Sequence, residues 1–418
     1  MAETQIGRGA LARPGLVAAA LAFAGLPLYI HAPRFYAEEM AVGLPILGVV
    51  LLLARGIDSV QDPVIGWLAD RLRAWREIWV IGAVALLGTG IAILFAPPEW
   101  GDPLPRLVIG LLAAFTGFSA LQIVLYDHGL ALANRAGGGH TRVALWREVG
   151  GLAGICLASL APPLLAIAFG VPLAFVGYAV VFTLIATLAV IGMAGRWQAS
   201  AAPAIGAAGF RRALSTPGVA PLLGFGFLNA LPTAVTSTLF LFFVAEILHA
   251  EAHAGPTLLL FFAAAAFAAP FWARLAERTG RRQALAVGMT VSILAFAWAY
   301  SLGPGDISAF YVIAAASGAA LGADMTLTPA MLAARIDGDG GRVFALWTFL
   351  QKSALALGAG ITLPALALAG FNPSDAVEAS GREALSVAYA LVPCALKLFA
   401  IGALAFISDE KESIREKK

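Results

Sequence analysis

Charged residues are scarce in this sequence. Of 418 residues only 12% are charged, whereas 60% are hydrophobic. Soluble domains average about 25% charged and about 45–50% apolar residues. A soluble monomer of this composition would expose large apolar patches and would aggregate. The composition therefore excludes a soluble enzyme and a disordered protein, and it indicates that lipid surrounds most of the folded chain.

Cysteine is also rare, and several catalytic motifs are missing. The two cysteines, Cys156 and Cys394, lie inside apolar runs, which indicates unpaired core residues and excludes a secreted disulfide scaffold. The sequence contains no nucleotide-binding P-loop, no G-x-S-x-G and no paired C-x-x-C. These absences argue against ATP-driven transport and against the common hydrolases. We expect no enzymatic activity and no cofactor.

Long apolar runs are abundant instead. A helix needs about 20 apolar residues to cross about 30 Å of hydrocarbon. We expect twelve such helices, at 14–32, 43–68, 78–96, 105–132, 146–169, 172–194, 217–247, 256–275, 283–302, 308–334, 344–369 and 385–407. The first run follows Arg8 and Arg13 as in a signal peptide, but it has no clear cleavage site, so we expect it to remain as the first helix.

The distribution of basic residues predicts the orientation. Of the 27 Lys and Arg residues, 21 fall on the side shared by both termini, three fall on the opposite side and three lie within helices. The positive-inside rule then places both termini in the cytoplasm, and we expect a bacterial inner (plasma) membrane. The formal net charge of +2 reflects this topology. We expect a small-molecule substrate and the lipid bilayer as partners, no nucleic acid, and a monomer.

The sequence contains an internal repeat. Asp62-Pro63-x-x-Gly66-x-Leu68-Ala69-Asp70-Arg71 recurs 207 residues later as Ala269-Pro270-x-x-Ala273-x-Leu275-Ala276-Glu277-Arg278. A second echo, Arg142-Val143 and Arg342-Val343, has an offset of 200 residues. The repeat predicts an N-terminal six-helix bundle over 1–195, a central cytoplasmic loop over 196–216 and a C-terminal six-helix bundle over 217–418.

The repeated loop is a candidate gating motif. Gly66 permits close helix approach, while Asp70 can cap the helix or pair with Arg71, Arg73 or a neighbouring helix end on the cytoplasmic face. Glu277 and Arg278 occupy the matching places in the second half. The alternative is a solvated turn with ordinary topogenic arginines, and the recurrence at a fixed offset favours the functional interpretation.

The two-half plan and this motif resemble the major facilitator superfamily over essentially the whole chain. The resemblance implies an all-α membrane protein whose 12 transmembrane helices form two pseudo-symmetric six-helix bundles. A narrower resemblance, to the glycoside–pentoside–hexuronide:cation symporter family, rests on the segments 54–66, 141–147 and 350–352. They read ARGIDSVQDPVIG, TRVALWR and LQK.

Carboxylates within the expected membrane helices are candidates for ion coupling. Asp58 and Asp62 are four residues apart, so they share a helix face with Cβ atoms about 5–6 Å apart. Two carboxylates this close in a poorly solvated place repel, so one is protonated or a cation lies between them. The alternative is that Asp58 pairs with Arg55 or Arg147 while Asp62 caps a helix end.

The family resemblance adds further residues to this cation site. It implies that Gln61 and Ser119 contribute oxygen atoms for Na⁺ or H⁺ coupling, and that Lys352 supports the site by pairing with Asp58 or Asp62 across the two halves. The alternative for Lys352 is snorkelling towards the interface. We interpret Lys397 as snorkelling or structural. No metal is expected other than Na⁺ at the two aspartates.

The substrate site is expected on the helix over 105–132 and its neighbours. Gln122 and Tyr126 share a helix face and match family positions for sugar binding, as does Arg147, for which a topogenic or gating role is the alternative. Asp324, within the helix over 308–334, echoes this site in the second half. It is a candidate substrate-binding residue, a proton carrier or a partner of Lys352.

The sequence departs from the family at two places. Residues 15–30 contain no acidic residue, whereas the family's sugar transporters carry one there, and Gln122 replaces a second acid. A site selective for hydroxyls needs polar partners. We therefore expect a Na⁺- or H⁺-coupled symporter of a small solute, sugar-like or other. The alternatives are a proton-driven exporter or lipid transporter on the same fold, and an integral-membrane enzyme or assembly factor.

Overall fold

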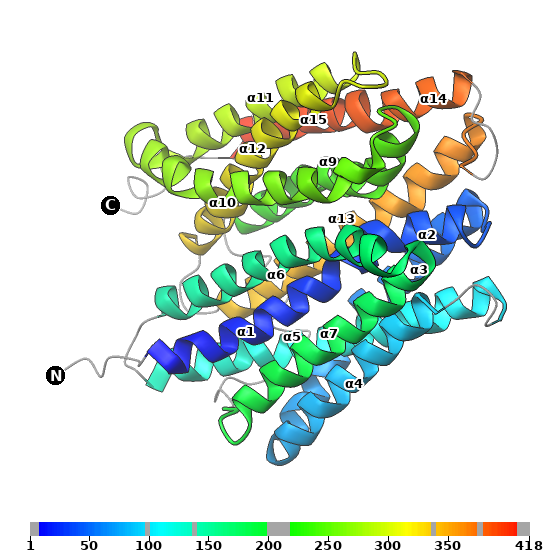
Figure 1. Ribbon diagram of the computed structural model, residues 1–418. Coiled ribbons are helices and arrows are strands. Elements are labelled where there is room, and N and C mark those ends of the chain that lie inside the picture. Colours follow the sequence, from blue (N-terminus) through cyan, green and yellow to red (C-terminus); the bar gives the residue numbers. More distant parts are fainter. Residues whose placement is uncertain are drawn as a thin grey trace. The chain divides into compact units, whose positions relative to one another are not determined.

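The structure, a computed structural model, is entirely helical where the chain is described. It describes residues 8–96, 101–135, 140–198, 218–335, 340–373 and 379–407, and no strand occurs in these ranges. Twelve helices are long and apolar enough to cross a membrane. The predicted all-α membrane fold with twelve spans is therefore confirmed (Figure 1).

The N-terminal half contains six of the twelve spans. Its helices are α1 (Arg8–Leu26), α2 (Ala32–Glu38), α3 (Leu44–Arg71), α4 (Arg76–Leu94), α5 (Pro103–Arg135), α6 (His140–Phe169) and α7 (Val171–Met193). A π-helical turn over Pro27–His31 joins α1 to α2, so that they form one span ending at Glu38. The first span is therefore longer than the apolar run at 14–32 indicates.

The C-terminal half contains the other six spans. Its helices are α9 (Val219–Glu246), α10 (Ala254–Thr279), α11 (Arg281–Ala299), α12 (Ile307–Ala333), α13 (Gly340–Leu368), α14 (Ala379–Ser386) and α15 (Val392–Ala405). A second π-helical turn, Val387–Leu391, joins α14 to α15 in the last span. This span begins at Ala379, before the predicted residue 385, because its first turns carry polar residues such as Ser380 and Arg382.

The chain divides into two compact units that do not coincide with the two halves. One unit contains Met1–Val42 and Gly56–Ile205, and the other contains Gly43–Arg55 and Gly206–Lys418. The first half of α3 thus packs with the second unit. A Cβ atom on Gly48 of α3 would lie 2.6 Å from Cδ of Pro364 in α13. The expected central loop at 196–216 falls mostly on residues 199–217, which lie outside the described residues.

Small residues set the helix spacing inside each unit. In the first unit, a Cβ atom on Gly154 of α6 would lie 2.1 Å from the carbonyl oxygen of Ala19 in α1. In the second unit, a Cβ on Gly318 of α12 would lie 2.1 Å from the carbonyl oxygen of Phe261 in α10. Such close backbone contact favours helix association in lipid, where the hydrophobic effect contributes little.

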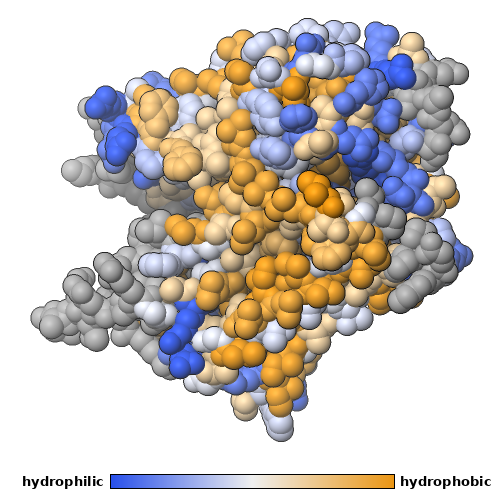
Figure 2. Space-filling view, viewed as in Figure 1, coloured by the Kyte–Doolittle hydropathy of each residue, from blue (hydrophilic) through white to orange (hydrophobic). Residues whose placement is uncertain are grey.

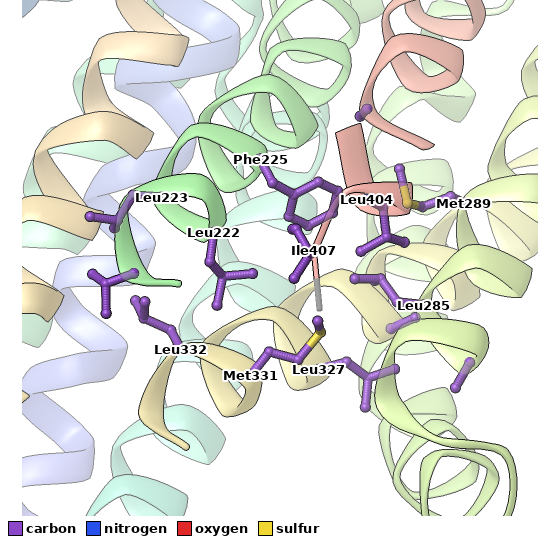
Figure 3. Packing of buried hydrophobic residues seen from close by; sticks show 14 of the residues in the cluster. Leu222, Leu223, Phe225, Leu285, Met289, Leu327, Met331, Leu332, Leu404 and Ile407 are labelled. Atoms are coloured by element: carbon purple, nitrogen blue, oxygen red, sulfur yellow. The ribbon is translucent and has the colours of Figure 1, made fainter. Parts of the chain in front are cut away.

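Large apolar side chains fill the remaining interior and also cover much of the outside. A cluster in the second unit joins α9, α11, α12 and the end of α15 through residues such as Phe225, Met289, Leu327 and Leu404 (Figure 3). Apolar side chains also gather on the outer surface (Figure 2). Leu368, for example, is 90% exposed. In a membrane-spanning helix such side chains face lipid rather than water.

Candidate ion-coupling and substrate sites

Asp58 is the centre of a polar cluster in the first unit. It lies on α3, its side chain is buried, and its Oδ1 accepts a 2.8 Å hydrogen bond from Oγ of Ser119 on α5. The two residues are 4% and 1% exposed. The bond joins two membrane spans through a carboxylate and a hydroxyl, which are the group types predicted for the cation site.

Gln61 and Thr116 extend this cluster. Nε2 of Gln61 donates to Oδ1 of Asp58 at 3.2 Å, and Oγ1 of Thr116 donates to Oε1 of Gln61 at 2.9 Å. The chain of bonds runs from α5 to α3 and back to α5. Thr116 is absent from the predicted site. Its position one turn before Ser119 on the same helix face is the sequence signal that would have identified it.

Asp62 lies one helical turn after Asp58. Because α3 is continuous from Leu44 to Arg71, the two carboxylates share a face as predicted, and Asp62 is half-buried. Pro63 lies inside α3 and has no N–H group, so the carbonyl oxygen of Ser59 lacks its usual donor four residues later. This carbonyl adds an oxygen to the same stretch of the helix.

Two of the predicted substrate residues are in direct contact. The Arg147 guanidinium on α6 lies over the Tyr126 ring on α5, with 4.1 Å from Cζ to the ring centroid. A cation–π contact of this kind contributes about 0.5–2 kcal/mol, depending on solvation. Tyr126 is 48% exposed and Gln122, one turn earlier on α5, is half-buried. The three residues provide an aromatic face, a cation and an amide on two adjacent helices.

An ion pair next to this group was not predicted. Arg76, at the start of α4, donates to Oδ2 of Asp127 on α5, and the arginine side chain is buried. The sequence indicates only a topogenic role for Arg76. The pair links α4 to α5 beside Tyr126. Its partners are 51 residues apart, which is why no local pattern indicates it.

Asp324 has a different partner from the predicted Lys352. Nζ of Lys397 on α15 lies 2.6 Å from Oδ2 of Asp324 on α12, with side-chain exposures of 4% and 14%. Of the two interpretations of Lys397, snorkelling is wrong and the structural one agrees with this pair, because the ammonium is buried against a carboxylate inside the second unit. Lys352 on α13 is 9% exposed and belongs to the second unit. Its pairing with Asp58 or Asp62 stays a prediction.

The repeated loop motif forms only some of the contacts that we expected. Asp70 accepts from Nη2 of Arg73, one of its expected partners, at 2.9 Å, whereas the guanidinium of Arg71 lies 5.4 Å from the Trp67 ring centroid. A Cβ built on Gly66 would meet no described atom within 4 Å, so the expected close helix approach is not present at this glycine. In the second copy of the motif, Glu277 and Arg278 are both exposed at the end of α10.

Comparison with known proteins identifies the type of protein. A family model described as MFS/sugar transport protein matches residues 14–409. No match was found among curated proteins.

Solved structures of transporters share the fold. A bacterial homologue of the human lysosomal transporter Spinster, in an inward-facing and unoccupied conformation, is 15% identical with a TM-score of 0.69 and covers 95% of each chain. The nucleoside transporter NupG is 14% identical with a TM-score of 0.70, over 96% of this chain and all of its own. A bacterial homologue of the human peptide transporters PepT1 and PepT2 is 12% identical with a TM-score of 0.66, over 95% and 96%. At these identities the likeness concerns the fold, whereas the family match covers nearly the whole chain, and the chain therefore belongs to the MFS/sugar transport protein family of integral membrane transporters.

Proposed function

We propose that this protein is a cation-coupled symporter that moves a small solute by alternating access, with Na⁺ or H⁺ bound at Asp58 and Asp62. The observation that carries the proposal is the hydrogen bond from Ser119 to the buried Asp58, extended by Gln61. A buried carboxylate inside a membrane helix is costly unless it is paired, hydrated or bound to an ion. Hydroxyl and amide donors orient this carboxylate, and their oxygen atoms can ligate a cation.

Binding of the coupling ion follows from the spacing of the carboxylates. Two carboxylates one turn apart in a poorly solvated helix repel each other, and a proton or a cation between them removes that repulsion. A hard cation takes several oxygen ligands. The carboxylates, Gln61, Thr116, Ser119 and the carbonyl of Ser59 supply such oxygens within two turns of α3 and the facing turns of α5.

The substrate proposal rests on the neighbouring group. Tyr126 offers an apolar face, Arg147 a cation, and Gln122 both a donor and an acceptor. These groups suit a small solute with hydroxyl or carboxylate groups and an apolar face. In a coupled symporter the cation raises the affinity for the solute, and linkage then requires the solute to raise the affinity for the cation by the same factor.

Orientation and gating complete the proposal. The excess of basic residues on one side supports cytoplasmic termini in a bacterial plasma membrane. In this scheme Lys352 supports the cation site from the second unit, and the motif around Asp70 gates the cytoplasmic side. The two halves rock about a substrate held near the midplane.

A second candidate function follows from the apolar first span. Residues 15–30 on α1 and its π-helical extension have no acidic side chain, and Tyr29 supplies the only side-chain hydroxyl among them. A pocket with few polar groups favours a less polar or amphiphilic solute. The same fold would then serve a lipid-type transporter or a proton-driven exporter.

Thermal unfolding with and without Na⁺ tests the cation site without a known substrate. A ligand at 100 times its Kd stabilises the folded state by about 2.7 kcal/mol. We expect Na⁺, or protons in a pH series, to raise the Tm of the native protein. Asp58→Asn and Asp62→Asn should lose this shift, whereas Asp102→Asn, a loop control, should keep it. A Na⁺ or pH shift that survives in both variants would contradict the site.

Uptake into proteoliposomes then separates the two functions. Sugars, organic acids and lysolipids are screened first by thermal shift, with and without Na⁺, and the stabilising solutes are tested for transport. Symport predicts that an inward Na⁺ or proton gradient drives accumulation. Proton-driven export predicts the reverse direction of movement relative to the proton gradient. If neither gradient changes the flux of a transported solute, both coupled mechanisms are wrong.

A further inference from the structure

A groove separate from the proposed coupling and substrate sites runs along the first unit between α4 and α7. Its volume is about 650 Å³. Small residues of α4, among them Gly88, form one wall, and hydroxyl-bearing residues of α7, among them Thr183 and Thr187, form the other. A Cβ on Gly88 would lie 3.4 Å from Oγ1 of Thr183, so the helices are in contact along the floor. Side chains too small to fill the space above this contact leave the groove open.

The groove opens to the surface that faces lipid. Ile81 on α4 and Ile191 on α7 line it and are 58% and 62% exposed. Both helices belong to membrane spans. Exposed aliphatic side chains at this depth contact acyl chains, so the natural content of the groove is apolar and elongated.

One end of the groove carries both signs of charge. Glu77, in the first turn of α4, lines the groove, and its carboxylate accepts a hydrogen bond from the backbone N–H of Gly195 just after α7. Arg196 lies between the lining residues Ala194 and Trp197 but does not itself line the groove; it is exposed and donates from Nη1 to the carbonyl oxygen of Ala194 at 3.0 Å. Trp197 lines the same end, where interfacial tryptophans are typical of membrane proteins.

We propose that this groove binds a zwitterionic phospholipid with a primary-amine headgroup, of the phosphatidylethanolamine class. The ammonium group pairs with the Glu77 carboxylate, the phosphate with the Arg196 guanidinium, and one acyl chain lies between α4 and α7. Each charge of the headgroup is opposite in sign to the side chain that it meets. A purely anionic headgroup would face repulsion from Glu77.

The length of the groove fits a lipid of one leaflet. The lining residues on α4 run from Glu77 to Ala92, which at about 1.5 Å per residue spans about 22 Å. One leaflet of the hydrocarbon core is about 15 Å thick. An acyl chain that starts from a headgroup at Glu77 therefore stays inside the groove for its full depth in the leaflet.

The competing occupant is a helix from a second copy of the chain. Small residues also favour helix packing in membranes. Apolar helix packing gives no role to the opposite charges at the groove end, whereas a zwitterionic headgroup uses both. The observations therefore favour lipid, and a second copy becomes an outcome of the test.

Native mass spectrometry of the detergent-purified protein, mixed with equal amounts of phosphatidylethanolamine, phosphatidylcholine and phosphatidylglycerol, tests the proposal. We expect phosphatidylethanolamine to be retained about two- to fivefold over each of the others, as exposed charge pairs allow. Thr187→Phe should fill the groove and abolish the selective retention. Leu188→Phe is the matched control, because Leu188 is 68% exposed on the same helix but does not line the groove.

A second variant tests the headgroup contact separately. Glu77→Gln keeps an acceptor for the Gly195 N–H but removes the charge, so it should bind lipid with no preference for the amine headgroup. Equal retention of the three lipids by the native protein would overturn the proposal, as would unchanged selectivity in Thr187→Phe. A dimer mass that Thr187→Phe removes and Leu188→Phe keeps would assign the groove to a second copy instead.

Discussion

Two aspartates within membrane spans, the buried Asp58 and the half-buried Asp324, accept hydrogen bonds from different kinds of donor. Asp58 accepts from a hydroxyl and an amide, both neutral, whereas Asp324 accepts from the ammonium of Lys397. A hydroxyl and an amide carry oxygen acceptors as well as donors, whereas an ammonium carries donors only. Hydroxyl and amide oxygens can also ligate a cation, so the surroundings of Asp58 suit ion binding, whereas the second carboxylate joins α12 to α15 through an ion pair.

The largest expected effect comes from breaking the ion pair of the second unit. Asp324→Asn or Lys397→Met should lower the free energy of unfolding by about 3–5 kcal/mol, because each leaves a buried charge without its partner. Thermal unfolding in detergent measures the loss.

The double variant decides between a structural and a transport role for this pair. Asp324→Leu combined with Lys397→Met should regain most of the stability, because a well-packed apolar pair replaces a buried ion pair at little cost. A structural pair predicts that transport also returns. A double variant that is stable but does not transport would instead support the substrate-binding role expected for Asp324. Asp324 and Asp58 would then both act in transport.

A smaller effect is expected from removing the hydroxyl of Ser119, which donates to Asp58. Ser119→Ala should lower the free energy of unfolding by up to about 1.7 kcal/mol, the upper range for interhelical hydrogen bonds in membranes. The same variant should weaken the Na⁺- or pH-dependent rise in Tm. Thr290→Ala is the control, because that hydroxyl is exposed and bonds only within its own helix in the described contacts. A stability loss as large as that of Asp324→Asn would show that the hydrogen bond from Ser119 contributes as much to stability as the ion pair does.

The smallest effect is expected from Thr116, which is linked to Asp58 only through Gln61 in the hydrogen bonds described above. Thr116→Val keeps the shape but removes the donor to Gln61, and it should lower stability by about 0.6 kcal/mol, the average for such bonds. The readout that matters is the thermal shift with Na⁺. A weaker shift with nearly unchanged stability would place Thr116 in the coupling site, whereas an unchanged shift would limit its role to packing.

The sequence predicted the spans and the candidate coupling residues because both depend on local patterns. Apolar runs mark the helices, and the four-residue spacing of Asp58 and Asp62 places them on one face of α3. Ser119 was identified by family resemblance, and its bond to Asp58 agrees with that expectation. In each case the relevant information lies within one helix or one motif.

The missed features depend on packing between distant segments. Lys397 and Asp324 are 73 residues apart, and neither flanking sequence indicates that α12 meets α15 at this level. Of the two arginines expected to pair with Asp70, Arg73 does so because the chain turns after Leu72 and places Arg73 on the side of the carboxylate. Gly66 has no close neighbour because a small residue permits contact between helices without requiring it.

The π-helical turns in the first and last spans have a consequence for the faces of those helices. In each turn a backbone N–H reaches back five residues, from Ala32 to Pro27 and from Val392 to Val387. One residue added to a helical turn rotates everything beyond it by about 100° relative to an uninterrupted α-helix. The hydroxyl of Tyr36 donates to the carbonyl oxygen of Leu94. The side chain of Tyr36 points inward because the π-helical turn before it contains one extra residue. Helical periodicity counted from the first residue of either span therefore assigns the wrong residues to the interior in the part that follows the π-helical turn.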